Sequence, residues 1–574
     1  MEEEWLFDAC ADSYIPILNV IHKLTKEGIS PKITIDISPI LCEQLKDKEF
    51  KRKFKEFCQW KIDSALNDQK DFREKHIRYL TKMWETFYTE IYLSFIRDYD
   101  EDLVNAFKRL QDKGHIEIMS SSATHAYFPA IAEDASIQMQ VILALKNYIK
   151  CFSKYPNGFW LPECGYRPSY HWKSPIFFKQ SGNTYLRKGV EEFLSELNIK
   201  YFIVDHHQLM NAKPYDLKKD PFYAYTAKRP KKAEEPVTVL SRNVDLSLQV
   251  WSHELGYPGD GAYLEFHKKK EGGKLRYWKI TNKKYELVFK DPYIPKEAEQ
   301  KVKEHAGHYK WLITNNLKHH FESTGDAAMI LTSFDAELYG HWWFEGPKFL
   351  YHVIKWISID PQIKTESISE FLERMPAKSE VYLPESSWGN HYNNSTWINK
   401  ETEWVLGREY SVEREMKNLV KDLGGKAQDD ATLARIIKQA ARELLLLQTS
   451  DWKFMITNWV ARDLAENRIT QHYNNFWRLT QLAWDYGLGR KIPSSEWEYL
   501  YECERKNGFF NEIELKGEIL TTIKNDYGKI ELVREIQKAE GNIPCFATER
   551  ANNCDEKNCI WREDCLKYFN LKIK

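Results

Sequence analysis

Short runs of β-branched and aromatic residues alternate with long amphipathic stretches as far as Trp404. These runs are too short for helices, and because they are apolar throughout they suit parallel strands that are buried on both faces. We predict six strands, at Ile33–Ile37, Ile116–Met119, Gly158–Leu161, Tyr201–Val204, Leu248–Trp251 and Met329–Thr332. Most are followed closely by polar or acidic residues, as at the carboxyl ends of the strands in a β/α barrel or an open parallel sheet. The pattern therefore predicts an α/β fold.

Helical periodicity dominates elsewhere. Residues from Asp47 to about Lys113 are highly charged, with Phe50, Phe54, Phe57 and Trp60 on one helical face. Beyond Trp404 the strand pattern stops, and Asp430 is expected to cap a helix with apolar residues at helical spacing (Leu433, Ile436, Ile437, Ala440, Leu444 and Leu447). We expect a catalytic domain over 1–405 with insertions at about 47–113 and 258–285, a helical domain over 406–540 and a cysteine-containing tail over 541–574.

Composition narrows the classes of function. The 574 residues carry 83 Lys and Arg against 84 Asp and Glu, a net charge of −1, which argues against broad binding to nucleic acid or anionic membranes. No apolar run approaches the roughly 18 residues of a membrane span. The chain opens on Met1 followed by three glutamates, where a secretory signal would be basic, so we expect a cytoplasmic protein. We expect it to be a monomer or a small homo-oligomer.

Aromatic residues make up 14% of the chain, with 20 Trp, 32 Tyr and 29 Phe. A large aromatic core accounts for most of them, but Trp and Tyr faces beside carboxylates also suit the C–H faces and hydroxyls of sugars. Near the end of the chain, Cys545, Cys554, Cys559 and Cys565 lack the paired C-x2-C knuckles of zinc sites. Our leading interpretation is reduced thiols without a structural role; a zinc or iron–sulfur site and a disulfide remain as alternatives.

Common catalytic motifs are absent: there is no phosphate-binding G-x-x-x-x-G-K-[ST] loop and no dinucleotide fingerprint after a strand. Instead, three segments place a carboxylate at a strand end among aromatics: Gly158–Tyr166 with Glu163, Gln249–Asp260 with Glu254, and Thr332–Trp343 with Asp335. Each carboxylate alone could be a capping or paired ion. Two opposed carboxyl groups, however, suffice for glycoside chemistry, and three acids at strand ends favour a site.

These segments resemble the signature regions of glycoside hydrolase family 57, above all its α-1,4-glucan branching enzymes, and the resemblance runs from Trp5 to about Trp484. It implies a seven-stranded β/α barrel with a C-terminal helical domain, an α-glucan substrate such as amylose or glycogen, and no metal or organic cofactor. It also implies Glu254 as nucleophile and Asp335 as general acid/base of a retaining mechanism, with carboxyl groups about 5–5.5 Å apart.

The same resemblance implies further substrate-binding residues. His125 is expected to bond sugar hydroxyls, and Asp205 to orient a sugar or a neighbouring histidine. Trp388 and Trp397 are expected to form subsite walls, and the pair Asp451-Trp452 to bring the helical domain over the cleft. The remaining candidates are Trp5, Trp160, Glu163, Trp251, Arg276, Trp278 and His341. Packing in the core remains the alternative for any single tryptophan and for His125.

Three departures from the family pattern affect these expectations. Relatives begin with a strand that ends in His-x-His-x-Pro-Tyr, and this chain starts just after that point, so the first strand is expected to be absent. The segment from Asp260 to Lys279 is short, which removes a shielding loop and favours some hydrolysis; there Arg276 and Trp278 either reach the cleft or lie on a surface hairpin. Asn390 to Asn394 stands where a Gly-rich stretch is usual.

Branching of α-glucans is the favoured activity. The alternatives are an α-amylase, a 4-α-glucanotransferase, a non-catalytic glycan-binding protein, and a metal-dependent deacetylase using Asp205, His206 and His207.

Overall fold

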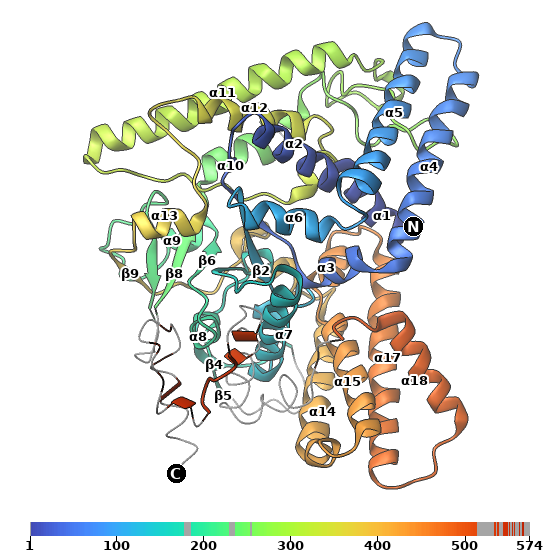
Figure 1. Ribbon diagram of the computed structural model, residues 1–574, viewed down its shortest axis with the longest axis vertical. Coiled ribbons are helices and arrows are strands. Elements are labelled where there is room, and N and C mark those ends of the chain that lie inside the picture. The colour runs from blue at the N-terminus through green and yellow to red at the C-terminus, as the bar shows by residue number, and fades with distance from the viewer. Residues whose placement is uncertain are drawn as a thin grey trace.

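The computed structural model describes residues 2–176, 185–228, 236–252 and 255–511, with short runs and single positions between 513 and 566. A mostly parallel sheet in the order β1-β2-β3-β6-β8-β7-β9 lies at its centre (Figure 1). The strands are β1 (Ile33–Asp36), β2 (Ile116–Ser121), β3 (Gly158–Trp160), β6 (Tyr201–Val204), β7 (Tyr225–Ala227), β8 (Val237–Ser241) and β9 (Glu380–Val381). Neighbours from β1 to β8 are parallel, whereas β7 runs antiparallel to β8 and parallel to β9. A separate hairpin pairs β4 (Tyr170–Trp172) with β5 (Tyr185–Arg187).

Four of the six predicted strands are confirmed, as β1, β2, β3 and β6. The prediction for Leu248–Trp251 is wrong, because these residues end helix α10 (Val244–Trp251), which Asn243 caps by accepting the N–H of Leu246. Leu246 and Val250 are buried one helical turn apart, whereas Leu248 and Trp251 are about half exposed. The apolar run thus covers both faces of a helix, and the strand lies earlier, at β8.

The segment Met329–Thr332 is extended but is not part of a ladder among the described residues. Its backbone makes isolated hydrogen bonds instead. The N–H of Asn243 donates to the carbonyl of Leu331 at 2.6 Å, and the N–H of Met329 donates to the carbonyl of Phe222 at 3.1 Å. Strand β1 and this segment line one cavity, and β1 has β2 as its neighbour in the sheet. The apolar sequence therefore correctly predicts extension here, but neither pairing nor full burial, because all four residues are partly exposed.

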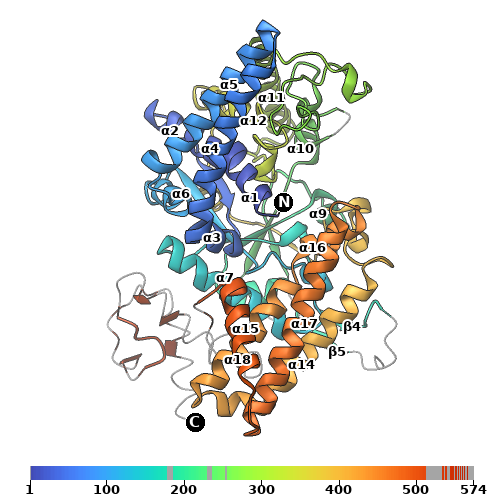
Figure 2. The same ribbon diagram turned by 90° about the vertical axis from the view of Figure 1, so that its right-hand side faces the viewer.

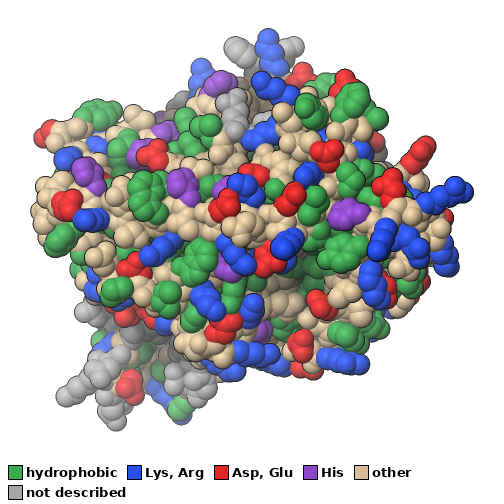
Figure 3. All heavy atoms as spheres, turned by 90° about the horizontal axis from the view of Figure 1, so that it is seen from above, with side chains coloured by type: hydrophobic (Ala, Val, Ile, Leu, Met, Phe, Trp, Pro, Cys, Tyr) green, Lys and Arg blue, Asp and Glu red, His purple; other side chains and the backbone are tan. Residues whose placement is uncertain are grey.

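Helices cover the sheet and extend beyond it (Figure 1). They are α1 (Glu2–Ala9), α2 (Ile15–Lys26), α3 (Pro39–Lys46), α4 (Lys48–Asp71), α5 (Lys75–Leu93), α6 (Leu103–Asp112), α7 (Asp134–Phe152), α8 (Val190–Glu196), α9 (His206–Met210), α10, α11 (Pro295–Thr324), α12 (Gly346–Ser358) and α13 (Ile368–Arg374). None of the helices in the described part of the chain is long and apolar enough to cross a membrane. On the face seen from above, acidic and basic side chains are interspersed, in keeping with the net charge of −1 (Figure 3).

Helices α4 and α5 form a hairpin that projects from the sheet (Figure 1). Asp47 starts α4 by accepting the N–H groups of Glu49 and Phe50, both at 2.9 Å. Phe50, Phe54 and Phe57 are buried along one face as predicted, and Trp60 at the end of the stripe is 40% exposed.

A helical bundle follows the sheet: α14 (Glu403–Ala427), α15 (Ala431–Leu447), α16 (Ser450–Thr457), α17 (Arg462–Gly487) and α18 (Ser494–Asn507) (Figure 2). Asp430 caps α15 as predicted, accepting the N–H groups of Thr432 and Leu433 at 3.0 Å. The bundle shares a buried cluster with Met139 and Leu143 of α7, so α7 packs against both the sheet and the bundle. This packing brings the start of α16 to the sheet.

Candidate active site

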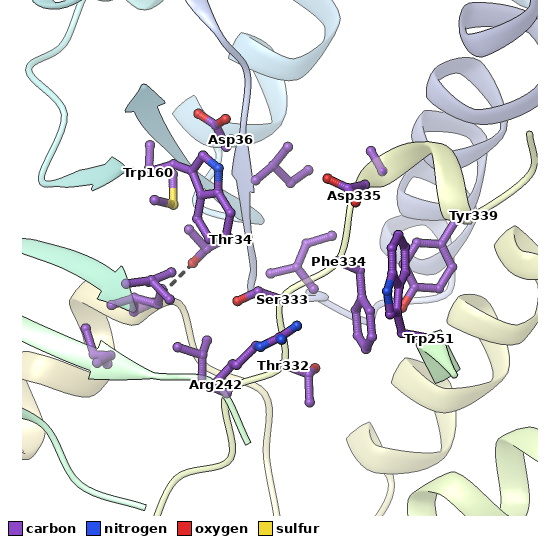
Figure 4. Close-up of a pocket in the computed structure, with 18 of the residues that line it drawn as sticks. Thr34, Asp36, Trp160, Arg242, Trp251, Thr332, Ser333, Phe334, Asp335 and Tyr339 are labelled. Carbon is purple, nitrogen blue, oxygen red and sulfur yellow. Dashed lines mark hydrogen bonds between the residues drawn. The ribbon is translucent and has the colours of Figure 1, made fainter. Parts of the chain in front are cut away.

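A cavity of about 1950 Å³ opens at the carboxyl ends of the parallel strands. Asp36 ends β1, His125 follows β2, Glu163 follows β3, and Arg242 follows β8. Asp335 contributes from the extended segment opposite β1 (Figure 4). The helical bundle adds Asp451 and Trp452 of α16 to the same lining. Two of the three predicted carboxylates, Glu163 and Asp335, therefore meet around one space, which is where a parallel α/β sheet places its ligands.

Asp335 points into this cavity from the end of the extended segment, next to Phe334 and Tyr339 (Figure 4). Burial, reinforced by the carboxylates of Glu337 and Glu163, raises its pKa to about 7. A carboxyl group with that pKa carries a proton over much of the range below neutrality. Asp335 can therefore donate a proton to a leaving oxygen and later take one back.

Glu163 is held in a fixed orientation by three contacts. Its φ of 62° is left-handed, and its carbonyl accepts the N–H of Trp388 at 3.0 Å. One carboxylate oxygen accepts the indole N–H of Trp388 at 2.8 Å, and the other accepts the hydroxyl of Ser450 at 3.2 Å. Burial raises the pKa of Glu163 and the charge of Asp451 adds to this effect. The side chain of Glu163 thus connects the end of a strand with the helical bundle and with the loop that contains Trp388.

His125 lies beside Glu163 and is also tied to the bundle. Its Nδ1 lies 2.8 Å from the hydroxyl of Ser450, and its carbonyl accepts the N–H of the same residue. Burial acts to lower its pKa, but the carboxylates of Glu163 and Asp451 outweigh it, so the pKa is raised. The imidazole therefore gains positive charge between acids and can donate to a sugar hydroxyl.

In the described chain, His125, Glu163 and Asp451 form the group of His, Cys, Asp and Glu donors whose atoms all lie within 4.8 Å of one another. This donor set is the one that could hold a metal ion in the cavity. However, both oxygens of Glu163 and Nδ1 of His125 already take part in hydrogen bonds with Trp388 and Ser450. That arrangement suits hydroxyl binding better than a closed metal site.

Asp36 is a site residue that the sequence reasoning missed. It ends β1 and lines the cavity; one of its carboxyl oxygens is buried without a hydrogen-bond partner (Figure 4). Burial raises its pKa to about 7, although the nearby His125 acts to lower it. The signal was present, because Asp36 is an acid at the end of a predicted strand, as Asp335 is at the end of an extended segment.

Asp205 lies beneath the cavity rather than in its lining, fully buried at the N-terminus of α9. Its carboxylate binds the guanidinium of Arg242 at 2.5 Å and Nδ1 of His207 at 3.2 Å. Burial acts to raise its pKa, but these two partners outweigh it and the pKa is lowered. Asp205 therefore contacts a histidine and also Arg242, which sequence reasoning missed. A fixed guanidinium at this carboxylate opposes the metal site that a deacetylase using Asp205, His206 and His207 requires.

Aromatic side chains line the cavity in two pairs. Trp160 and Trp388 meet edge to face with ring centroids 5.0 Å apart, and Arg242 lies over the Trp388 ring at 5.4 Å. The ring centroids of Trp251 and Trp342 are 5.9 Å apart, and each of the two side chains is about 40% exposed. Trp397 reaches the lining but is 1% exposed and stacks on Tyr127 at 4.3 Å, so it also serves the core.

Four predicted site residues lie elsewhere. Trp5 is 44% exposed on α1 and does not line the cavity. Arg276 pairs with the buried Asp12 at 3.4 Å, and His341 lies 3.6 Å from the same carboxylate. The ammonium group of Lys268 lies over the ring of Trp278, 4.4 Å from the ring centroid.

The short segment after Asp260 packs against the α4–α5 hairpin instead of the cavity. Lys270 pairs with Asp68 at 2.6 Å, and the indole of Trp84 donates to the carbonyl of Arg276. In the described part of the chain, no residue between 252 and 308 lines the cavity.

Glu254, the predicted nucleophile, lies outside the described residues, as does His253. Trp251, three positions earlier, lines the cavity (Figure 4). Gly256 N–H donates to the carbonyl of Ser252 at 2.7 Å, and a Cβ at Gly256 would stand 2.3 Å from that oxygen. Only glycine fits this close approach.

Comparison with known proteins gives the family of the chain. A family model described as glycosyl hydrolase family 57 matches residues 1–384, and one described as the C-terminal part of 1,4-alpha-glucan branching enzyme matches residues 409–517. The chain is 36% identical over 520 residues to a 1,4-alpha-glucan branching enzyme of Thermococcus kodakarensis, spanning 89% of this chain and 74% of that protein.

Solved structures give the same result. A GH57-type branching enzyme from Pyrococcus horikoshii matches with a TM-score of 0.82 at 35% identity, covering 89% of this chain and 92% of that one. The alpha-amylase AmyC from Thermotoga maritima matches with a TM-score of 0.74 at 27% identity, covering 91% and 95%. The predicted fold class and family resemblance are confirmed. Because the family model spans well over half of the 574 residues, the chain belongs to glycosyl hydrolase family 57.

Proposed function

We propose that this chain is a 1,4-α-glucan branching enzyme, which cleaves an α-1,4 linkage and transfers the released segment to a 6-hydroxyl of a glucan. The observation that carries the proposal is the match of residues 409–517 to the branching-enzyme C-terminal model. The matched bundle places Ser450, Asp451 and Trp452 of α16 against the cavity. The identity to a named branching enzyme over most of the chain supports the same activity.

In the proposed mechanism, Asp335 protonates the glycosidic oxygen while Glu254 attacks the anomeric carbon. The leaving chain departs with a new 4-hydroxyl, and the donor segment remains as an ester on Glu254. The Asp335 carboxylate then takes the proton of an acceptor 6-hydroxyl, and this oxygen displaces Glu254. The raised pKa of Asp335 supports the first role, because the group must hold a proton near neutrality.

The polar residues of the cavity are proposed to bind sugar hydroxyls. His125 and Glu163 share Ser450 as a partner, so a change in the position of α16 alters both together. Arg242 presents its guanidinium beside Trp388, held from below by Asp205. Fixed donors and acceptors of this kind orient a substrate without cost at the moment of reaction.

Water and the acceptor hydroxyl compete for the ester on Glu254. Transfer requires that an acceptor is bound and that water is excluded. Trp160, Trp388 and Trp452 give the cavity aromatic faces for an acceptor chain. None of the described residues between 252 and 308 lines the cavity, so this segment gives it no shielding loop. We therefore expect branching with an appreciable hydrolytic side reaction.

Replacing Trp388 with Ala tests the acceptor role. We expect the ratio of new reducing ends to new branches to rise roughly two- to tenfold, as the loss of about 0.5–1.5 kcal/mol of aromatic contact predicts. Trp388→Phe keeps a ring and should stay near the wild-type ratio. The matched control is Trp459→Ala, on a residue that is 73% exposed and does not line the cavity. An unchanged ratio in Trp388→Ala would refute the acceptor role.

The activity itself is tested by incubating the protein with amylose, counting reducing ends, and profiling chains before and after treatment with an α-1,6-specific debranching enzyme. We expect short chains to appear only after debranching, with a smaller rise in reducing ends. Steadily rising reducing ends with no new chains on debranching would make the protein an α-amylase. An altered chain-length distribution without branches would make it a 4-α-glucanotransferase.

We place the reaction in a reducing compartment such as the cytoplasm. The support is that all ten cysteines are free.

A further inference from the structure

The cysteines near the end of the chain lie against the core of the sheet. Phe546, Ala547, Ala551 and Cys565 are buried in the same cluster as α8 and the strands β6 and β8. Cys559 packs on this cluster as a partly buried residue. No described residue beyond 511 lines the cavity, so this part of the chain is separate from the proposed catalytic site.

The four thiols converge even though twenty residues separate the first from the last. Cys545, Cys554 and Cys559 all lie close enough to Cys565 for their charges to interact with it. The backbone N–H of Ala547 donates to the sulfur of Cys565 at 3.1 Å, and the side-chain amide of Gln537 donates to that of Cys545 at 3.3 Å. Donors aimed at sulfur are what a metal-bound thiolate requires from its surroundings.

Among the described residues, the four sulfurs are not gathered as closely as the ligands of a zinc ion. All four cysteines are free of disulfides. A tetrahedral zinc site with Zn–S bonds of about 2.3 Å holds its sulfurs about 3.8 Å apart. The four thiols do not meet that condition, because the donor group within 4.8 Å in the described chain is instead His125, Glu163 and Asp451. A four-iron cluster takes one thiolate on each iron, and it therefore holds its cysteine sulfurs farther apart than a single metal ion does.

Charge around the thiols also fits such a cluster, since four thiolates on a four-iron, four-sulfide core give a net negative charge. Arg562 donates to the carbonyls of Cys554 and Glu556, and Arg534 donates to those of Phe546 and Ala547. These bonds hold two guanidinium groups beside the cysteines. They also fix the backbone on either side of the ligands.

We propose that Cys545, Cys554, Cys559 and Cys565 bind a four-iron, four-sulfide cluster that fastens the end of the chain to the sheet. Ligation replaces four S–H bonds by four Fe–S bonds and releases four protons to solvent. The role is structural, and the cluster takes no part in glucan transfer.

The test uses the full chain, purified without oxygen and analysed as isolated and after treatment with sulfide and equal amounts of ferrous and ferric iron, because the four-iron core holds two irons in each state. We expect about four iron and four sulfide per chain, with broad absorbance near 400 nm that bleaches on reduction. Cys565→Ser and Cys554→Ser should lower the iron content at least tenfold. Cys503→Ser, on α18 and outside the four, should keep it. Amylose turnover measured alongside shows that each variant is folded, and we expect it to stay near wild type at room temperature.

Three results would each overturn the proposal: about one zinc per chain in place of iron, disulfides among the four cysteines in the anaerobic protein, or no iron after treatment with iron and sulfide. Iron that persists in both Cys565→Ser and Cys554→Ser would overturn the assignment of the ligands. Because Cys554 is only partly buried, its variant remains informative if Cys565→Ser fails to fold.

Discussion

Glu254→Gln and Asp335→Asn are each expected to lower the rate of transfer from amylose by roughly 10³–10⁶-fold, which corresponds to about 4–8 kcal/mol of transition-state stabilisation. The reason is that each replacement removes a step: an amide at 254 cannot form the ester, and an amide at 335 cannot donate a proton to the leaving oxygen. Initial rates of branch formation on amylose give the measurement.

The control for these variants is Glu304→Gln, the same chemical change on an exposed residue that pairs with Lys301. It should retain wild-type activity. Thermal unfolding of all the variants separates a catalytic defect from a folding defect. Near-normal rates in folded Glu254→Gln or Asp335→Asn would contradict the assignment of the pair.

The pH profile of kcat/KM is expected to fall on its alkaline side with a midpoint near 7, about tenfold for each further pH unit. Asp335 must be protonated for the first step, and its pKa is raised to about 7 by burial and by the carboxylates of Glu337 and Glu163. As pH rises through that value the protonated fraction disappears, so activity is present below the midpoint and lost above it.

Two experiments test whether this alkaline limb, the fall in kcat/KM above pH 7, is due to Asp335. Glu337→Gln removes one of the charges that raise the pKa, so the limb should move to lower pH. An α-maltosyl fluoride donor needs no proton on its leaving group. With this donor, the rate of the first step should therefore no longer fall on the alkaline side. A limb that keeps its position in both experiments would assign the titration to another group.

Much of the parallel sheet could be predicted because its strands are locally encoded. Ile33–Asp36, Ile116–Ser121 and Tyr201–Val204 carry short apolar runs between turn residues, and each forms a ladder. Leu248–Trp251 has the same composition, but its burial follows helical spacing, which four residues are too few to reveal. Pairing of Met329–Thr332 depends on what lies beside it, and no local pattern carries that information.

The same distinction holds at the site. Asp335 and Glu163 were found because acids that follow predicted strands meet at one edge of a sheet, whereas His125 was found through the family resemblance. Arg242 was missed because its place depends on a buried partner, Asp205, 37 positions earlier in the chain. Arg276 has the chemistry of a site residue, yet tertiary packing directs it to Asp12 instead.

The ester between a glucan segment and Glu254 is the centre of the proposed mechanism, and trapping it tests that mechanism most directly. In Asp335→Asn, α-maltosyl fluoride can still load the enzyme because fluoride leaves without a proton, whereas the second step lacks its base and is slow. After rapid acid quenching and proteolysis, peptide mass spectrometry should find the maltosyl adduct on the peptide that contains Glu254, and Glu254→Gln/Asp335→Asn should carry none. An adduct on another residue, or none while maltosyl fluoride is consumed, would contradict the proposed mechanism.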